Sequence, residues 1–497
     1  MKNTQFCRRF FSGTISYLCF CILIAAVSSP AAAAAPIRKP ASTNRFLIAS
    51  DLHFNPMADA SLVPQLDKAS PTEWETILDR SKPTAFSQYG QDTNWWLLRS
   101  ALDAMRVTLP HPSFIMLTGD FLAHQFPQTY QRTAQDNSRV AYRNFVLKTV
   151  EFLSLELRKR FPQTRIYLTP GNNDNECGNY SIEADGLFLR DTADVARQLA
   201  RADDEFTNTW QALGSYDVPN PALHGVRIIS LNTVFLSNKY HAAQFASDCA
   251  PVPSTAPADL FTWLEGRLNL ARQAHEKVWL MFHIPPGMDG FTSIQQYLSV
   301  VKQKSDKTPP QVCASALVPM WVPKWTKQFD DLLAKYENTV VASFAGHTHA
   351  DDFRVIDNSA GNSSFVLISP AISPIYNQNP SFRTVTFAAN GSVSDQSVYY
   401  LTNLLFASSS SPGEWKREYT FSQEWKMEGV NAKNLAALYR EILGEQADQD
   451  EWLKLYNVSS SAAYVPAGMA PGLYCAIEGL DPEAYGKCFC PAVTHSN

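Results

Sequence analysis

The chain has 497 residues, of which 45% are hydrophobic and 18% charged, and a formal net charge of -5 at pH 7. This composition is that of an ordinary globular protein rather than a disordered or coiled-coil chain, and the length predicts one large domain with a smaller appendage. A negative balance without runs of lysine or arginine argues against nucleic-acid binding, which depends on neutralising phosphates.

The first 35 residues have the pattern of a secretory signal peptide. Basic residues precede an apolar run at 15–27, and small residues follow up to Ala35, where an A-x-A-like cleavage site is expected. The apolar run is short for a membrane span of about 20 residues, and no later apolar stretch is long enough to cross a membrane. We therefore expect a secreted, periplasmic or lumenal chain with no transmembrane segment after cleavage.

Five short apolar runs along the chain each end in a polar residue suited to binding metal. Such runs, bounded by turn-forming residues, are typical of buried strands, and helical patterns separate the first three of them. This β-α-β order predicts an α/β fold in which ligands collect at the carboxyl ends of the strands. The expected strands are 46–49, 114–117, 166–168, 278–282 and 340–345, and the expected helices are 95–107 and 142–160.

The polar residues at these strand ends form, in chain order, D-x-H, G-D, G-N, a single histidine and G-H-x-H. This mixture of carboxylate, amide and imidazole donors suits Zn, Fe or Mn better than Ca or Mg. Two adjacent cations repel each other, and a carboxylate between them offsets that repulsion. One such motif is weak evidence, but all five in order predict a two-metal centre. The residues are Asp51, His53, Asp120, Asn172, His283, His347 and His349.

In order and spacing these motifs resemble those of calcineurin-like metallophosphoesterases, and the finer motifs resemble the acid sphingomyelinase-like phosphodiesterase branch. The resemblance implies a four-layer α/β/β/α metallophosphoesterase sandwich over residues 45–400. A small C-terminal helical, cysteine-containing subdomain is expected over 401–497. The finer motifs are G-D-x-x-x-H at 119–124, H-I-P-P-G at 283–287 and G-H-T-H-x-D-x-F at 346–353.

The resemblance also implies roles for individual residues. Hydroxide held between two divalent metals would attack phosphorus, and His124, four residues beyond Asp120, would protonate the leaving group. The alternative for His124 is a loop histidine bonded to a backbone carbonyl. Zinc is the expected metal, although the donors also suit Fe or Mn. Asp51, His53 and His349 would bind the first metal, Asn172, His283 and His347 the second, and Asp120 would bridge them.

At Asn173 the sequence departs from the family pattern, which commonly has histidine directly after the ligand asparagine. We assign Asn173 to that catalytic position, but an amide cannot carry a proton at working pH. Either His124 alone acts as the acid, or the substrate has a good leaving group. The G-N-N-D motif is also similar to that of endopolyphosphatase relatives.

The expected activity is hydrolysis of a small phosphodiester or related phosphoester. Nucleotides, phospholipid headgroups and polyphosphate-like compounds all fit this class. Only about ten residues separate the cleavage region from the first strand, so the saposin-like module of acid sphingomyelinases is not expected, and sphingomyelin is not the favoured substrate. The alternatives are a phosphomonoesterase or polyphosphatase, and a catalytically silent metal-bound binding protein.

The six cysteines beyond the signal segment suggest disulfides, with 15 ways to pair them. Cys475, Cys488 and Cys490 are expected to contribute at least one local bridge. Helical patterns at 423–427, 431–443 and 451–456 support a helical C-terminal region. Residues 305–323, which are polar and contain prolines, are expected to be a loop near the rim of the site that contributes to substrate selectivity.

Overall fold

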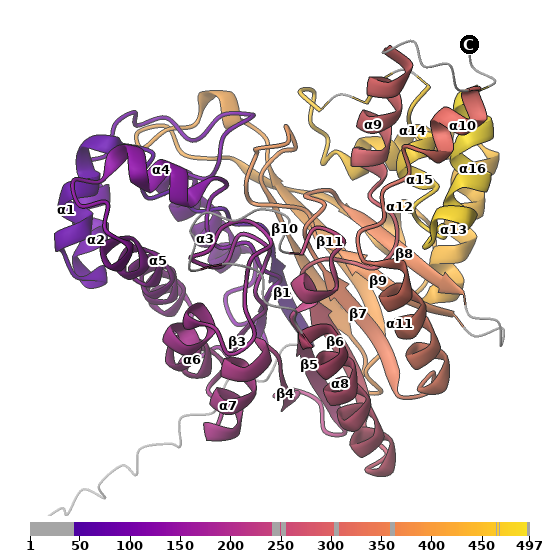
Figure 1. The fold of residues 1–497 in the computed structure, drawn as a ribbon, viewed down its shortest axis with the longest axis horizontal. Coiled ribbons are helices and arrows are strands. Elements are labelled where there is room, and N and C mark those ends of the chain that lie inside the picture. The colour runs from indigo at the N-terminus through magenta and orange to yellow at the C-terminus, as the bar shows by residue number, and fades with distance from the viewer. Residues whose placement is uncertain are drawn as a thin grey trace, which may run out of the picture. The chain divides into compact units, whose positions relative to one another are not determined.

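The computed structural model describes residues 44–240, 249, 255–302, 308–357, 363–463, 465–466 and 468–494. The predicted signal segment, residues 1–35, lies outside these ranges. Residues 42–497 belong to one compact unit. Its two six-stranded mixed sheets lie between helices, which makes an α/β architecture (Figure 1).

The first sheet has the strand order β12-β11-β10-β1-β2-β3. β1, β2 and β3 run parallel, while β10, β11 and β12 are joined by antiparallel pairing. The parallel strands are buried, as short apolar runs predict. The bounds are β1 (Arg45–Ala49), β2 (Ile115–Leu117), β3 (Ile166–Leu168), β10 (Ser381–Phe387), β11 (Val393–Leu401) and β12 (Trp415–Thr420).

The second sheet has the order β4-β5-β6-β7-β9-β8. Its four central strands, β5, β6, β7 and β9, are parallel, and an antiparallel strand closes each edge. The bounds are β4 (Tyr216–Pro219), β5 (Val226–Leu231), β6 (Lys277–Phe282), β7 (Val340–Ala345), β8 (Asp352–Asp357) and β9 (Ser363–Ile368).

Aromatic side chains hold the two sheets face to face. The ring centroid of Phe46 on β1 lies 5.4 Å from that of Trp279 on β6 and 5.5 Å from that of Phe344 on β7. Trp279 also lies 5.5 Å from Phe387 on β10. All four rings are buried, so this inter-sheet layer contributes a large hydrophobic stabilisation and fixes the strand ends of one sheet against those of the other.

Helices cover the outer faces of both sheets (Figure 1). α3, α5 and α6 lie beside the first sheet, and α8 and α11 beside the second. The helices that precede β5 are α1 (Val63–Lys68), α2 (Trp74–Leu78), α3 (Trp95–Thr108), α4 (Phe126–Thr133), α5 (Arg139–Arg160), α6 (Leu187–Ala200) and α7 (Asp204–Leu213). Those between β5 and β7 are α8 (Ala256–Gln273), α9 (Gly290–Lys302), α10 (Pro309–Ala314) and α11 (Pro323–Lys335).

The C-terminal region is helical, as expected. It also supplies β12, which completes the first sheet, while the proposed boundary at residue 401 stays a prediction. The helices are α12 (Phe421–Glu424), α13 (Ala432–Gly444), α14 (Gln446–Tyr456), α15 (Pro471–Tyr474) and α16 (Pro482–Thr494). Short 3-10 helices are η1 (Ala60–Leu62), η2 (Pro71–Glu73), η3 (Thr233–Leu236) and η5 (Leu404–Phe406).

The sequence predicts the five strands that precede the polar motifs correctly, but it misreads one segment. Residues 305–323 were expected to be a loop, and 315–322 lie outside any helix or named strand, but α10 begins at Pro309 and α11 at Pro323; residues 305–307 lie outside the described ranges. Proline is favoured in the first turn of a helix, where its missing N–H has no partner to lose. Pro309 and Pro323 therefore mark helix starts, while Pro319 lies in the connection between the two helices.

Three disulfides join the cysteines of the described residues. Cys475–Cys488 is the expected local bridge, and the other two, Cys177–Cys249 and Cys313–Cys490, connect distant segments. No helix in the described ranges has both the length and the apolar character needed to span a membrane.

Candidate metal centre

The polar residues predicted from the strand ends lie close together at the carboxyl ends of strands from both sheets. All of these side chains are buried except that of His347, which is partly exposed. Because the two sheets are packed together, strand ends from each reach the same point. Asp51 and His53 follow β1, Asp120 follows β2, Asn172 follows β3, His283 follows β6, and His347 and His349 follow β7.

Five of these residues have the left-handed backbone conformation that residues other than glycine rarely adopt. The φ angle is 50° at Asp51, 41° at His53, 55° at Asp120, 75° at His347 and 61° at His349. Each such conformation costs roughly 1–3 kcal/mol and persists only where the surrounding structure enforces it. Their concentration at one edge is typical of a functional site.

Two glycines of the motifs let the strand ends approach one another. A Cβ atom at Gly171 would overlap the backbone nitrogen of Asp120, and one at Gly346 would overlap the Oγ atom of Ser50. A larger residue at either position would push one strand end away from its neighbour. The glycines of G-N and G-H therefore belong to the geometry of the site.

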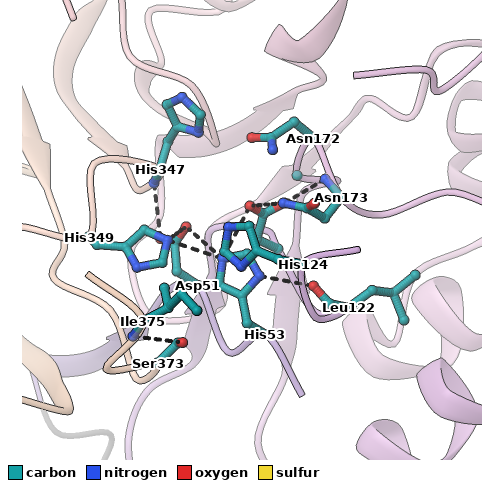
Figure 2. Close-up of polar contacts among 12 residues, drawn as sticks. Asp51, His53, Leu122, His124, Asn172, Asn173, His347, His349, Ser373 and Ile375 are labelled. Atoms are coloured by element: carbon teal, nitrogen blue, oxygen red, sulfur yellow. Dashed lines mark hydrogen bonds and ion pairs between the residues drawn. The ribbon is translucent and has the colours of Figure 1, made fainter. Parts of the chain in front are cut away.

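The first group of candidate ligands consists of Asp51, His53 and His349 (Figure 2). The Nε2 atoms of the two histidines lie 3.1 Å apart. Asp51 Oδ1 lies 3.7 Å from Nε2 of His53 and 3.3 Å from Nε2 of His349. The other oxygen of Asp51 accepts hydrogen bonds from Ser50 Oγ and from the backbone nitrogen of His347.

Asn172, His283 and His347 form the second group. Asn172 Oδ1 lies 3.0 Å from Nε2 of His283, and Nδ1 of His347 lies 3.3 Å from the same nitrogen. The amide nitrogen of Asn172 donates to Oδ1 of Asn179 at 2.7 Å. This bond turns the amide so that its oxygen, the atom that can bind a cation, faces the histidines.

Asp120 lies between the two groups. Its Oδ2 atom is 3.4 Å from Nε2 of His53 and 3.4 Å from Nε2 of His283. Asn173 donates two hydrogen bonds to this carboxylate, one from its backbone nitrogen at 2.8 Å and one from its amide nitrogen at 2.9 Å. A carboxylate that reaches both groups is positioned to bridge two cations.

Backbone carbonyls fix the orientation of two of the imidazoles. His53 Nδ1 donates to the carbonyl of Leu122 at 2.9 Å, and His283 Nδ1 donates to that of Thr118 at 2.6 Å. Since a carbonyl only accepts, the proton of each neutral ring is on Nδ1 and the lone pair of Nε2 faces the cluster. Metal-binding histidines are commonly held in this way.

Buried charges shift the pKa values of these groups strongly. Burial lowers the pKa of His53, but Asp120 and Asp51 outweigh burial and raise it to about 10. Asp120 likewise outweighs burial at His283 and raises the pKa of that ring to about 9. Although burial raises it, nearby histidines hold the pKa of Asp51 well below its usual range. Metal ions compete with the protons on these rings, so metal affinity should fall as the pH falls.

The arrangement fits a pair of divalent cations. Asp51 Oδ1 is buried, faces two imidazole nitrogens and has no hydrogen-bond partner among the described residues. The candidate ligand atoms of Asp51, His53 and Asp120 all lie within 4.8 Å of one another, as do those of Asp120, His283 and His347. Oxygen and nitrogen donors in this mixture suit Zn, Fe or Mn.

His124 lies at the edge of the first group. Its ring stacks on that of His53 with centroids 4.0 Å apart, and Asp92 accepts from its Nδ1 atom at 2.9 Å. Asp92 also accepts from its backbone nitrogen at 2.9 Å. The ring is therefore bonded to a carboxylate, not to the backbone carbonyl that the alternative interpretation proposed.

Residues 44–351, more than half of the chain, match the family model described as calcineurin-like phosphoesterase. The chain belongs to the calcineurin-like phosphoesterase family. It is 24% identical over 470 residues to acid sphingomyelinase-like phosphodiesterase 3b of Homo sapiens, which covers 90% of each chain. It is also 24% identical over 491 residues to cyclic GMP-AMP phosphodiesterase SMPDL3A of Mus musculus, covering 95% of this chain and 98% of that protein.

Among solved structures, the phosphoesterase is similar to a dimetal phosphatase from Danio rerio. The TM-score is 0.36 at 12% identity, and the match covers 72% of this chain and 96% of that one.

Two carboxylates outside the predicted ligand set support the site of this phosphoesterase. Asp92 comes from a loop with no metal motif, and nothing in its surroundings in the sequence connects it with His124. Asp174, directly after Asn173, caps the strand-end loops. It accepts from the backbone nitrogens of Gly171, Phe121 and Leu122 at 2.7 to 3.1 Å.

Proposed function

We propose that this phosphoesterase is an acid sphingomyelinase-like phosphodiesterase that hydrolyses small phosphodiesters at a two-metal centre. The observation that carries the proposal is the position of Asp120 between two groups of imidazole, amide and carboxylate donors. The sphingomyelinase-like and cyclic GMP-AMP phosphodiesterases to which the chain is similar support the diester.

Three residues would hold each metal, and one would be shared. Zinc is the metal we propose, because four of the six ligands other than Asp120 present imidazole nitrogen and the other two present carboxylate or amide oxygen, a combination that zinc favours. Asp51, His53 and His349 would hold the first ion, Asn172, His283 and His347 the second, and Asp120 both. Two divalent cations at this site would supply an activated water and neutralise charge on the phosphoryl oxygens.

His124 is the proposed proton donor to the leaving group. Asp92 holds Nδ1 of the ring, so the opposite nitrogen is free to face the substrate, and the side chain is 23% exposed. This hydrogen bond fixes the orientation of the ring, as the position of a general acid requires. Asp92 acts here as a positioning residue rather than a catalytic one.

Asn173 is proposed to act through Asp120. With its amide nitrogen bonded to the bridging carboxylate, the residue orients that carboxylate and contributes no proton. A single acid, His124, then serves the reaction. This arrangement also supports the second candidate function, a phosphomonoesterase or polyphosphatase, because a phosphoanhydride leaving group needs less protonation.

The proposed substrate is a small phosphoester, and the proposed location of the protein is outside the cell or in a lumenal compartment. The three disulfides support such a compartment, since disulfides persist in oxidising environments.

The test is a substrate panel on the zinc-reconstituted chain. We expect hydrolysis of bis-p-nitrophenyl phosphate, and removal of the metal by a chelator should abolish it. Cleavage of ATP or polyphosphate without cleavage of the diester would favour the second candidate. Stoichiometric metal with no hydrolysis of any substrate would contradict both and favour a binding protein.

A further inference from the structure

A cavity of about 190 Å³ opens beside the metal centre, on the side of His347. Tyr180 lies between the metal centre and the cavity, because its hydroxyl is 3.4 Å from Nε2 of His347 and its side chain lines the cavity. Tyr376 makes a second connection, with its ring 4.7 Å from that of His349 and 5.8 Å from that of His124. A group attached to phosphorus at the metals can therefore extend into this space.

The charged residues of the cavity wall compensate one another. Lys239 lies 3.5 Å from Asp289, and Arg354 forms an ion pair with Asp352. These two pairs give the described lining a net charge of zero. The Arg354 pair is almost fully buried, so its cation is already neutralised within the protein. A second phosphate group would have to lose its hydration here without gaining an unpaired cation, which is costly.

The rest of the wall is aromatic and aliphatic. Phe291 and Tyr376 stand at the rim with their rings 6.1 Å apart, and they are 50% and 44% exposed. Further in, Ile294, Met320 and Leu473 supply apolar surface that is buried. A cavity of about 150 Å³ is known to accept benzene, so this space has room for one aromatic ring. Tyrosine hydroxyls and the Nε atom of Arg354, which has no hydrogen-bond partner among the described residues, offer polar contacts as well.

We propose that this cavity is a subsite for one ester substituent of the substrate, and that it selects an uncharged organic group, aromatic or partly apolar, over a further phosphate. The inference rests on the proposed function, since it takes the metal centre as the phosphoryl site. Because such a cavity disfavours polyphosphate, the inference favours the phosphodiesterase over the phosphomonoesterase or polyphosphatase. The selection follows from a neutral, half-apolar wall next to a strongly charged centre.

The C-terminal region builds a large part of this subsite. Tyr456 at the end of α14 and Leu473 of α15 line the cavity, together with residues of the segment between these helices. Cys475, directly after α15, is bridged to Cys488 of α16. The bridge ties this wall to α16, and Gly472 of α15 packs closely against Ile294 of α9.

The variant that tests the proposal is Phe291→Lys, which places a free cation at the rim without disturbing the core, because the side chain is half exposed. The matched control is Phe406→Lys, an exposed phenylalanine that does not line the cavity. Equilibrium binding of phenylphosphonate and of methylphosphonate is measured on the zinc-reconstituted full-length chain. These probes share the phosphonate and differ only in the organic group.

We expect the unmodified chain and the Phe406→Lys control to bind phenylphosphonate about tenfold more tightly than methylphosphonate, because the ring is buried. In Phe291→Lys this ratio should fall to about threefold or less, since the rim loses an aromatic surface. The rate on tripolyphosphate relative to bis-p-nitrophenyl phosphate should rise in the same variant. The subsite proposal would be overturned if the unmodified chain bound the two phosphonates equally tightly, or if Phe291→Lys left the ratio of the two affinities unchanged.

Failure of the subsite and failure of the proposed function are distinguishable. The binding ratio needs no turnover, so it tests the cavity even if no ester is hydrolysed. If the diester is hydrolysed while the ratio is near one, the phosphodiesterase proposal stands and the cavity has another role.

Discussion

The metal centre and the neighbouring cavity are built in opposite ways. The centre gathers buried charges on residues whose backbone is held in the left-handed region, and its loops start at the ends of parallel strands. The cavity pairs its charges internally, and its walls come from helices and loops that include the cysteine-bridged C-terminal region. The packed sheets therefore fix the chemistry, whereas selectivity depends on how later segments fold over them. Changes in the two regions should therefore affect turnover and substrate affinity separately.

The largest effect is expected from Asp120→Ala. Without the carboxylate that lies 3.4 Å from both His53 and His283, neither cation keeps its shared ligand. Metal content should drop, and kcat/KM for bis-p-nitrophenyl phosphate should fall by about 10³-fold or more. Metal analysis by mass spectrometry and a steady-state assay measure both. The control is His224→Ala, which changes an exposed histidine outside the cluster. Full metal content and turnover in Asp120→Ala would remove Asp120 from the centre.

His124→Gln should separate catalysis from metal binding. The glutamine cannot donate a proton as an acid, so turnover of an ester with a poor leaving group should fall by about 10²-fold, while activated aryl esters slow much less. Metal content should be unchanged, since the proposed ligands remain. Comparison of kcat for alkyl and nitrophenyl esters measures the difference. Equal slowing of both classes would count against His124 as the acid.

The double variant Cys475→Ser with Cys488→Ser should act on the cavity and on stability, but not on the metal centre. The bridge closes a loop with a sequence separation of 13, and its removal should lower the free energy of unfolding by about 3 kcal/mol. Because α15 forms part of the cavity wall, KM for the aryl diester should rise more than kcat falls, with metal content retained. Thermal unfolding and steady-state kinetics measure these effects. A loss of bound metal would show that the two regions are not independent.

Asp330→Asn gives the smallest expected effect, on stability outside both sites. Burial, Asp331 and Asp481 raise the pKa of Asp330 to about 7 from its ordinary value of 3.8, against the opposing effect of Lys327. The folded state therefore binds the proton more tightly, and stability is lost as the pH rises from about 4 to 7. The variant should be stabilised by about 1–2 kcal/mol at pH 8 and hardly at pH 4. Chemical denaturation at both pH values measures the difference, and an equal effect at both would contradict the assignment.

The contrast between the regions also explains what the sequence could predict. Asp51, Asp120 and Asn172 come within four residues of the ends of apolar runs, so the local pattern of strand and ligand places them at the carboxyl ends of the strands before any tertiary contact is known. Phe291 and Tyr456 lie in one cavity only because distant segments pack together, and no spacing in the sequence reports that packing. Asp92 was missed for the same reason, since its bond to His124 depends on how two loops meet.

The disulfides show an intermediate case. The local bridge between Cys475 and Cys488 could be expected from proximity in the chain, whereas Cys177–Cys249 and Cys313–Cys490 span 72 and 177 residues and could not.

Anomalous diffraction from crystals of the zinc-reconstituted chain would locate the metals relative to the seven predicted ligands. Two peaks are predicted, one about 2.0–2.3 Å from donor atoms of Asp51, His53 and His349, and the other equally close to Asn172, His283 and His347. Both should contact the carboxylate of Asp120. A single peak, or peaks away from these seven side chains in a chain that hydrolyses the diester, would contradict a two-metal mechanism.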